Sequence, residues 1–302
     1  MGVNDPDVPI GSPAIVVTGA AGAVGHAACE TFVKLGWTVF GIDVHNGDYV
    51  TSSIDLVSDF DVGVSYITDK NPVCVLHLAA NKNVEEIERR PERWVELNVD
   101  LPLTLAKVLS ERSIHLLFLS SDYVFDGSTG NYDEAAPCHP TTAYGQQKLL
   151  VERRLLDLDA IVTVIRAASI FGVRGDFPSA VLNSLLRQND FCAFDDLITT
   201  PTFIGDLVAI LTRIVDRRAT GVFHAVGPDA ISRLVFAETI AQVFDLPKAN
   251  LYGGPCDTGR PQNLSLNNEV TCKYLNYYPN RLAATLHLNK SLWPSGNKFL
   301  QK

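Results

Sequence analysis

Residues 14–25 read A-I-V-V-T-G-A-A-G-A-V-G, and this stretch decides the fold. It opens with a short apolar run rich in β-branched side chains, which is typical of a buried parallel strand. Glycines follow at Gly19, Gly22 and Gly25, and a helical pattern runs over residues 23–35. The stretch therefore predicts a strand that enters a helix through a tight glycine-rich turn.

The same alternation continues along the chain. Further apolar runs predict strands at residues 38–42, 73–78, 115–120 and 161–165. Helical patterns lie between several of these runs, near residues 102–112 and 142–156. Strands that alternate with helices are typical of an α/β fold with a doubly wound parallel sheet, so we predict a Rossmann-like domain.

After Arg166 the alternation loosens, which indicates a second structural unit. One more strand is predicted at 221–225, between helices near 205–216 and 232–244. We predict a flexible tail over residues 1–12, a dinucleotide-binding domain over 13–170 to which 200–226 returns, and a smaller C-terminal substrate-binding cap made mainly of 171–199 and 227–302.

The composition limits the partners. A formal net charge of -9 over 302 residues argues against a phosphate-neutralising surface, so we expect no nucleic-acid binding. The six cysteines are scattered without a C-x-x-C pair, which favours a reduced, cytoplasmic protein, and we predict no metal site. No stretch approaches 18 apolar residues, so we expect no membrane span.

The glycine-rich turn predicts a dinucleotide site, because the N–H groups at the start of the following helix can bind phosphates. Asp43, at the end of the second strand, can accept hydrogen bonds from ribose hydroxyls and would repel a 2′-phosphate. We therefore expect NAD(H) or NADP(H), with NAD(H) favoured. The predicted cofactor-binding residues are Gly19, Gly22, Ala23, Val24, Gly25, Asp43, His45, Asp55, Leu56, Ala79, Ala80, Tyr144 and Lys148.

A Ser, a Tyr and a Lys follow at a spacing that suits carbonyl redox chemistry. Tyr144 and Lys148 stand four apart in a predicted helix and share one of its faces, and Ser121 ends the fourth strand. We expect the Lys148 ammonium to lower the pKa of the Tyr144 phenol from its usual value of ~10, so that the phenol exchanges a proton with a substrate oxygen. Ser121 would hydrogen-bond the same oxygen.

Together these motifs resemble the extended short-chain dehydrogenase/reductase family, over about residues 14–280. Within it, the chain is most similar to the dTDP-4-dehydrorhamnose reductases, which complete dTDP-L-rhamnose synthesis by reducing a 4-keto sugar nucleotide. The stretches that carry the likeness are D-V-H-N-G-D-Y (43–49), S-S-D-Y-V-F-D-G (120–127), Y-G-Q-Q-K (144–148) and G-R-P-Q-N (259–263).

The resemblance implies roles for individual residues. It implies that Ser121, Tyr144 and Lys148 are catalytic. It also implies that Asp122 and Val124 lie near the sugar and that Arg260 faces the nucleotide. Asn98 matches a position that supports the lysine. One position departs from the pattern. The rhamnose reductases carry R-T-S-W-V-Y-G where this chain reads R-A-A-S-I-F-G, so Ser169 replaces a tryptophan that packs on the sugar.

These observations predict an oxidoreductase, an NAD(P)H-dependent reductase of a nucleotide-activated 4-keto-6-deoxysugar. A dehydratase is disfavoured, because Asp122 is followed by Tyr123 rather than by the glutamate that such enzymes use. An epimerase of the same fold stays open. So does a non-catalytic NAD(P)-binding regulatory subunit, because that of methionine adenosyltransferase resembles these reductases. A homodimer is common in the family.

Overall fold

A seven-stranded parallel sheet forms the centre of the protein, which we describe from a computed structural model over residues 12–256 and 259–293. The strands lie in the order β11-β6-β5-β4-β1-β2-β3. They are β1 (Ala14–Thr18), β2 (Thr38–Asp43), β3 (Val50–Ser53), β4 (Cys74–His77), β5 (His115–Ser121), β6 (Val162–Ala167) and β11 (Gly221–His224). The predicted α/β class with a doubly wound parallel sheet is confirmed. The predicted tail lies, apart from Ser12, outside the described residues.

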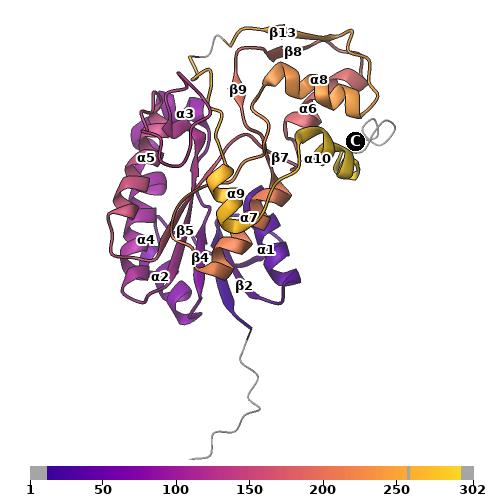
Figure 1. The fold of residues 1–302 in the computed structure, drawn as a ribbon. Coiled ribbons are helices and arrows are strands. Elements are labelled where there is room, and N and C mark those ends of the chain that lie inside the picture. The colour runs from indigo at the N-terminus through magenta and orange to yellow at the C-terminus, as the bar shows by residue number, and fades with distance from the viewer. Residues whose placement is uncertain (1–11, 257–258, 294–302) are drawn as a thin grey trace, which may run out of the picture.

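Helices cover both faces of this sheet (Figure 1). Successive strand residues point to opposite faces, so Ile15 and Val17 pack on one side and Val16 on the other. The first face is covered by α1 (Ala23–Lys34) and α7 (Ile204–Arg217). The second is covered by α2 (Phe60–Asp69), α4 (Leu101–Ser110) and α5 (Ala143–Leu156). Because both faces are buried, the strands read as continuous apolar runs.

The chain leaves the sheet after β6 and comes back to it. Strand β7 (Ile170–Phe171) pairs with β10 (Thr202–Phe203), α7 then packs beside α1, and β11 pairs in parallel with β6. Strand β11 is therefore part of the central sheet, and helix α7 is part of the helical layer that covers it. The division into a nucleotide-binding part and a cap stays a prediction.

The segments that leave the sheet after β6 and after β11 form a smaller unit above the edge of the sheet (Figure 1). This unit has its own core around Phe171, Phe236 and Trp293. Its helices are α6 (Phe177–Leu186), α8 (Arg233–Val243) and α10 (Leu282–Leu288). Its paired strands are β8 (Phe191–Phe194) with β13 (Leu251–Gly254), and β9 (Ile198–Thr199) with β12 (Ile231–Ser232). Helix α9 (Glu269–Leu275) packs against α7 and β11.

Among the α-helices and strands before residue 170, three were not predicted: β3, α2 and α3 (Val84–Arg89). The short strands β7, β8, β9, β10, β12 and β13 and the helices α9 and α10 were not predicted either. Strand β3 reads V-T-S-S at the edge of the sheet and lacks an apolar run, while α3 is a helix of only six residues capped by Asn83. Short turns follow α3, namely η1 (Pro91–Trp94) and a π-helical turn, η2 (Glu96–Asp100). Within the described ranges, every helix is too short or too polar to cross a membrane.

Candidate active site

Two adjoining cavities lie at the carboxyl edge of the sheet, where the chain order reverses between β1 and β4. Their volumes are about 390 Å³ and about 870 Å³. Both are lined by Gly19, Gly22, Leu78 and Ala80, so the glycine-rich turn stands between them. The larger cavity extends to Asp43, and the smaller one to Tyr144 and Lys148. Together they offer an elongated site of the kind that a dinucleotide requires.

The glycine turn has the backbone shape that the sequence predicted. Gly19 has a φ of +73°, a region that favours glycine, and a Cβ there would stand 2.8 Å from the backbone nitrogen of Ala79. The turn therefore packs directly on the chain that follows β4. Gly22, Ala23, Val24 and Gly25 line the smaller cavity at the first turn of α1. These residues fit a dinucleotide whose phosphates lie at that helix end.

Asp43 lines the larger cavity and is held in place by two hydrogen bonds. Its Oδ2 accepts a hydrogen bond from the Ala21 N–H at 3.0 Å, and its Oδ1 accepts one from the His45 N–H at 2.9 Å. The carboxylate is 11% exposed, whereas the His45 side chain is 82% exposed. Asp55, Leu56, Ala79 and Ala80 line the same cavity as Asp43 and His45. The eight predicted residues beyond the turn thus divide between the two cavities, with Tyr144 and Lys148 at the smaller one and Ala80 at both.

The predicted catalytic residues come from two elements and meet at the smaller cavity. Ser121 ends β5, while Tyr144 and Lys148 lie in the first turns of α5. Thr142 caps that helix by accepting a hydrogen bond from the Gly145 N–H at 3.1 Å. A Cβ at Gly145 would collide with the carbonyl oxygen of Tyr123, which explains the glycine in Y-G-Q-Q-K. The motif is therefore packed against the end of β5.

The expected effect of Lys148 on Tyr144 is wrong for this structure. Lys148 Nζ donates a hydrogen bond to the Leu119 carbonyl oxygen at 2.9 Å, and burial lowers its pKa to about 8. Burial raises the pKa of the Tyr144 phenol, and the neighbouring Asp122 carboxylate raises it further. The phenol is therefore held in its protonated, proton-donating form.

Asp122 is almost fully buried next to Ser121. Its Oδ1 accepts a hydrogen bond from the Ser121 hydroxyl at 2.8 Å. Burial raises the pKa of Asp122 to about 7, although the Ser121 hydrogen bond and the Arg233 charge oppose this shift. A carboxyl group that titrates near neutral pH thus lies against one of the predicted catalytic residues.

Only some of the residues predicted to contact the substrate line a cavity. Asp122, Ser169 and Arg260 line the smaller cavity. Val124 is fully buried, packs with Phe125 and Leu149, and lines neither cavity. Asn98 lies in the π-helical turn η2 and hydrogen-bonds Asn81 and Gln147, the residue before Lys148.

Several residues that line the cavities were not predicted, above all Arg233 at the start of α8. Its Nη2 donates a hydrogen bond to the Ser169 hydroxyl at 2.9 Å. Arg93 and Trp94 line the larger cavity from the turn after α3. Their positions depend on packing between distant segments, and the sequence carries no local motif for them.

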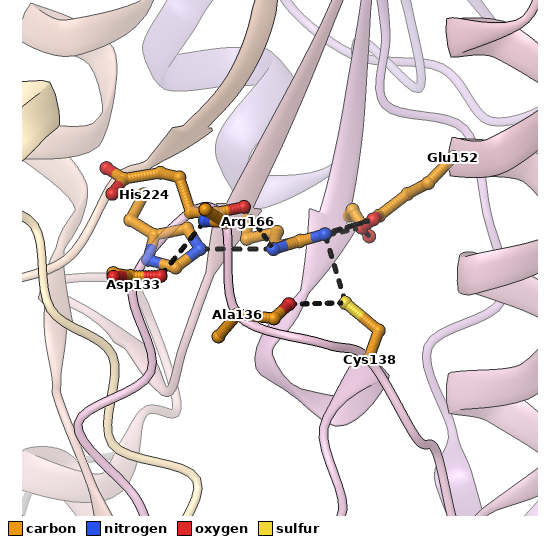
Figure 2. Close-up of polar contacts among 9 residues, drawn as sticks. Asp133, Ala136, Cys138, Glu152, Arg166 and His224 are labelled. Atoms are coloured by element: carbon orange, nitrogen blue, oxygen red, sulfur yellow. Dashed lines mark hydrogen bonds and ion pairs between the residues drawn. The ribbon is translucent and has the colours of Figure 1, made fainter.

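A buried ion pair lies behind the site (Figure 2). Arg166 of β6 donates a hydrogen bond from Nη2 to Glu152 Oε2 at 2.7 Å, and both side chains are buried. Glu152 also accepts a hydrogen bond from the Ser120 hydroxyl. Arg166 further contacts Cys138 Sγ at 3.2 Å and His224 Nε2 at 3.4 Å. This network ties the end of β5, next to Ser121, to α5, β6 and β11.

A family model for the RmlD substrate binding domain matches residues 13–281, which is most of the chain. Two curated proteins are similar to this chain. The probable low-salt glycan biosynthesis reductase Agl14 of Haloferax volcanii is 28% identical over 246 residues, which cover 75% of this chain and 79% of that protein. Methionine adenosyltransferase 2 subunit beta of Xenopus laevis is 27% identical over 255 residues, which cover 81% of this chain and 76% of that protein.

A solved structure supports the fold. It is that of dTDP-4-dehydrorhamnose reductase from Bacillus anthracis in complex with NADP, which is similar to this chain with a TM-score of 0.83. The match covers 93% of this chain and 98% of that one, at 18% identity. At this identity the likeness concerns the architecture.

Proposed function

This chain belongs to the RmlD substrate binding domain family, and on that premise we propose that it reduces a keto group of a nucleotide-activated sugar with NAD(P)H. The 4-keto group of a 4-keto-6-deoxysugar is the preferred substrate in this proposal. One observation carries it: Ser121, Tyr144 and Lys148 line the same cavity as the glycine-rich turn. A proton donor therefore stands next to a site that suits a dinucleotide.

The chemistry divides between the cofactor and the chain. A bound nicotinamide supplies the hydride. Tyr144, whose pKa is raised by burial, donates the proton to the carbonyl oxygen as it becomes an alcohol. Ser121 holds that oxygen by a hydrogen bond, for which its hydroxyl must leave Asp122. Lys148 places a positive charge beside the tyrosinate that remains.

The proposed cofactor is NAD(H) or NADP(H), with NAD(H) favoured. Asp43 supports this preference, since its carboxylate is fixed at the wall of the larger cavity and would repel a 2′-phosphate. The related Bacillus anthracis structure contains NADP, so both dinucleotides belong in the first assay. A higher kcat/KM for NADH is the expected result.

The decisive assay follows NADH or NADPH oxidation at 340 nm with dTDP-4-keto-6-deoxysugars as substrates. Tyr144→Phe removes the proton donor and should abolish turnover, whereas Tyr278→Phe, at an exposed position, should leave it unchanged. Undiminished turnover in Tyr144→Phe would refute the mechanism. Epimerised product without net NAD(P)H consumption would instead identify an epimerase. Size-exclusion chromatography with light scattering checks the proposed homodimer.

A regulatory subunit is the second candidate, because methionine adenosyltransferase 2 subunit beta is among the relatives. In that case the protein would bind NAD(P) and a partner enzyme without turning over a sugar. Capture of one partner at equal stoichiometry, together with no reduction of any keto sugar tested, would support this function over the first.

A further inference from the structure

The smaller cavity is positively charged, against the overall charge of the protein. It is lined by four basic residues and one acidic residue, namely Lys82, Lys148, Arg233, Arg260 and Asp122. The whole chain carries a formal charge of -9. A basic pocket on an acidic protein concentrates anionic ligands at that pocket. Lys148 is accounted for by the proposed chemistry, whereas Arg233 has no role in it.

Arg233 is fixed in place by the elements on either side of it. It is the first residue of α8 and directly follows β12, whose Ser232 pairs with Ile198 of β9. Its guanidinium carbon lies 5.0 Å from the centre of the Phe177 ring, and its Nη2 donates to Ser169 Oγ at 2.9 Å. The charged group is therefore pre-positioned at the cavity wall.

Ser169 makes this arrangement possible. Its φ is +44°, which is uncommon for a residue with a side chain, and its hydroxyl lies 3.0 Å from that of Thr199. Residues held in such backbone regions cluster at binding and catalytic sites. Where the rhamnose reductases carry a tryptophan against the sugar, this chain thus offers a serine, a threonine and an arginine. The wall is polar and charged instead of aromatic.

Arg260, which follows Arg233 in the chain, lines the same cavity. Its Nη2 contacts Glu85 at 3.1 Å, while its Nε is buried and has no hydrogen-bond partner among the described residues. Burial lowers the pKa of Arg233 most, the nearby Asp122 and Tyr123 raise it, and the Arg260 charge lowers it by the smallest amount. An anionic group in the cavity would be attracted by both guanidinium groups and could accept a hydrogen bond from the unused Arg260 N–H.

We propose that Arg233, positioned by Ser169, binds an anionic oxygen group of the substrate together with Arg260 and thereby selects the sugar nucleotide. This inference rests on the proposed function, because it assumes a nucleotide sugar in the cavity. The anionic group has two possible sources. One is the diphosphate, and the other is a carboxylate on the sugar at a place where a deoxysugar carries a methyl group.

Equilibrium binding to the full chain tests this without any need for turnover. Isothermal titration calorimetry compares thymidine with dTDP, and UDP-glucose with UDP-glucuronate, for wild type, Arg233→Gln, Arg233→Lys and Ser169→Ala. Arg213→Gln is the matched control, since Arg213 also stacks on an aromatic ring, that of Tyr277, but lines neither cavity. Circular dichroism confirms folding, and Arg233→Lys and Ser169→Ala serve if Arg233→Gln unfolds.

Each outcome decides the question. If Arg233 binds the diphosphate, Arg233→Gln lowers the affinity for dTDP by about tenfold or more and leaves the affinity for thymidine unchanged. If it binds a sugar carboxylate, only UDP-glucuronate weakens by that factor, while UDP-glucose does not. In either case the affinity decreases less in Arg233→Lys and in Ser169→Ala than in Arg233→Gln. Binding of every ligand within twofold of wild type, or no binding to wild type, would overturn the inference. A wild type that binds but never oxidises NAD(P)H refutes the proposed function alone.

Discussion

Replacing Asp122 by asparagine should stabilise the protein at neutral pH and leave its stability in acid nearly unchanged. The cause is the buried carboxyl group, whose pKa is raised from 3.8 in the unfolded reference to about 7 in the folded protein. A group whose pKa is higher in the folded state than in the unfolded state contributes its full stabilisation below its unfolded-state pKa. It loses this stabilisation as the pH rises through its folded-state pKa. Asparagine keeps an acceptor for the Ser121 hydroxyl but carries no charge to bury.

The size of the effect follows from the shift. Each pKa unit corresponds to 1.36 kcal/mol, so a shift of roughly three units corresponds to about 4 kcal/mol at pH 8. The difference in unfolding free energy between Asp122→Asn and wild type should therefore grow from near zero below pH 4 to about 4 kcal/mol above pH 7. Most of the change falls between these two values.

Urea unfolding at a series of pH values and constant ionic strength measures this difference. Asp157→Asn, which removes an exposed carboxylate at the end of α5, controls for the loss of one charge. A difference between Asp122→Asn and wild type that stays constant from pH 4 to pH 8 would show that Asp122 is ionised at little cost. The account of the site as a desolvated cavity would then fail.

Two further predictions concern the cofactor and the lysine. The kcat/KM for reduction should fall above about pH 8, because the buried Lys148 loses its proton there while Tyr144 stays protonated; in Lys148→Met this alkaline limb should be absent, and its persistence would assign it to another group. Gly19→Ala should cost about 1–3 kcal/mol and abolish NAD(P)H binding measured by fluorescence titration, because φ is +73° and the Cβ meets Ala79. Gly36→Ala, with a φ of +84° and open space around the Cβ, should keep cofactor binding, and a similar loss there would mean that backbone strain alone is responsible.

The sequence predicted the parts of the site that are encoded locally. The strand, turn and helix over residues 14–35 follow from a short apolar run, three glycines and a helical period, and β1, Gly19 and α1 have the expected form. Tyr144 and Lys148 share a helix face because four residues separate them. The ends of β2 and β5, which carry Asp43 and Ser121, were likewise predicted within a residue or two.

What the sequence could not provide depends on how distant segments pack. Arg233 reaches the cavity only because β12 pairs with β9, which brings two segments that lie far apart in the chain side by side. The direction of the Tyr144 pKa shift was predicted wrongly, because proximity to Lys148 was considered and burial beside Asp122 was not. Strand β3 escaped prediction because edge strands need little apolar surface.

The return of the chain to its sheet has a consequence for biosynthesis. Until β11 has left the ribosome, β6 has no neighbour on one side. Until α7 has left it, Leu207 and Leu211 cannot pack in the same core as Ile15 and Phe32. The nascent chain therefore carries an open strand edge and an uncovered apolar face while the segment between β6 and α7 is made. The glycine-rich turn is therefore synthesised long before its supporting layer, which is complete only when α7 (Ile204–Arg217) has been made.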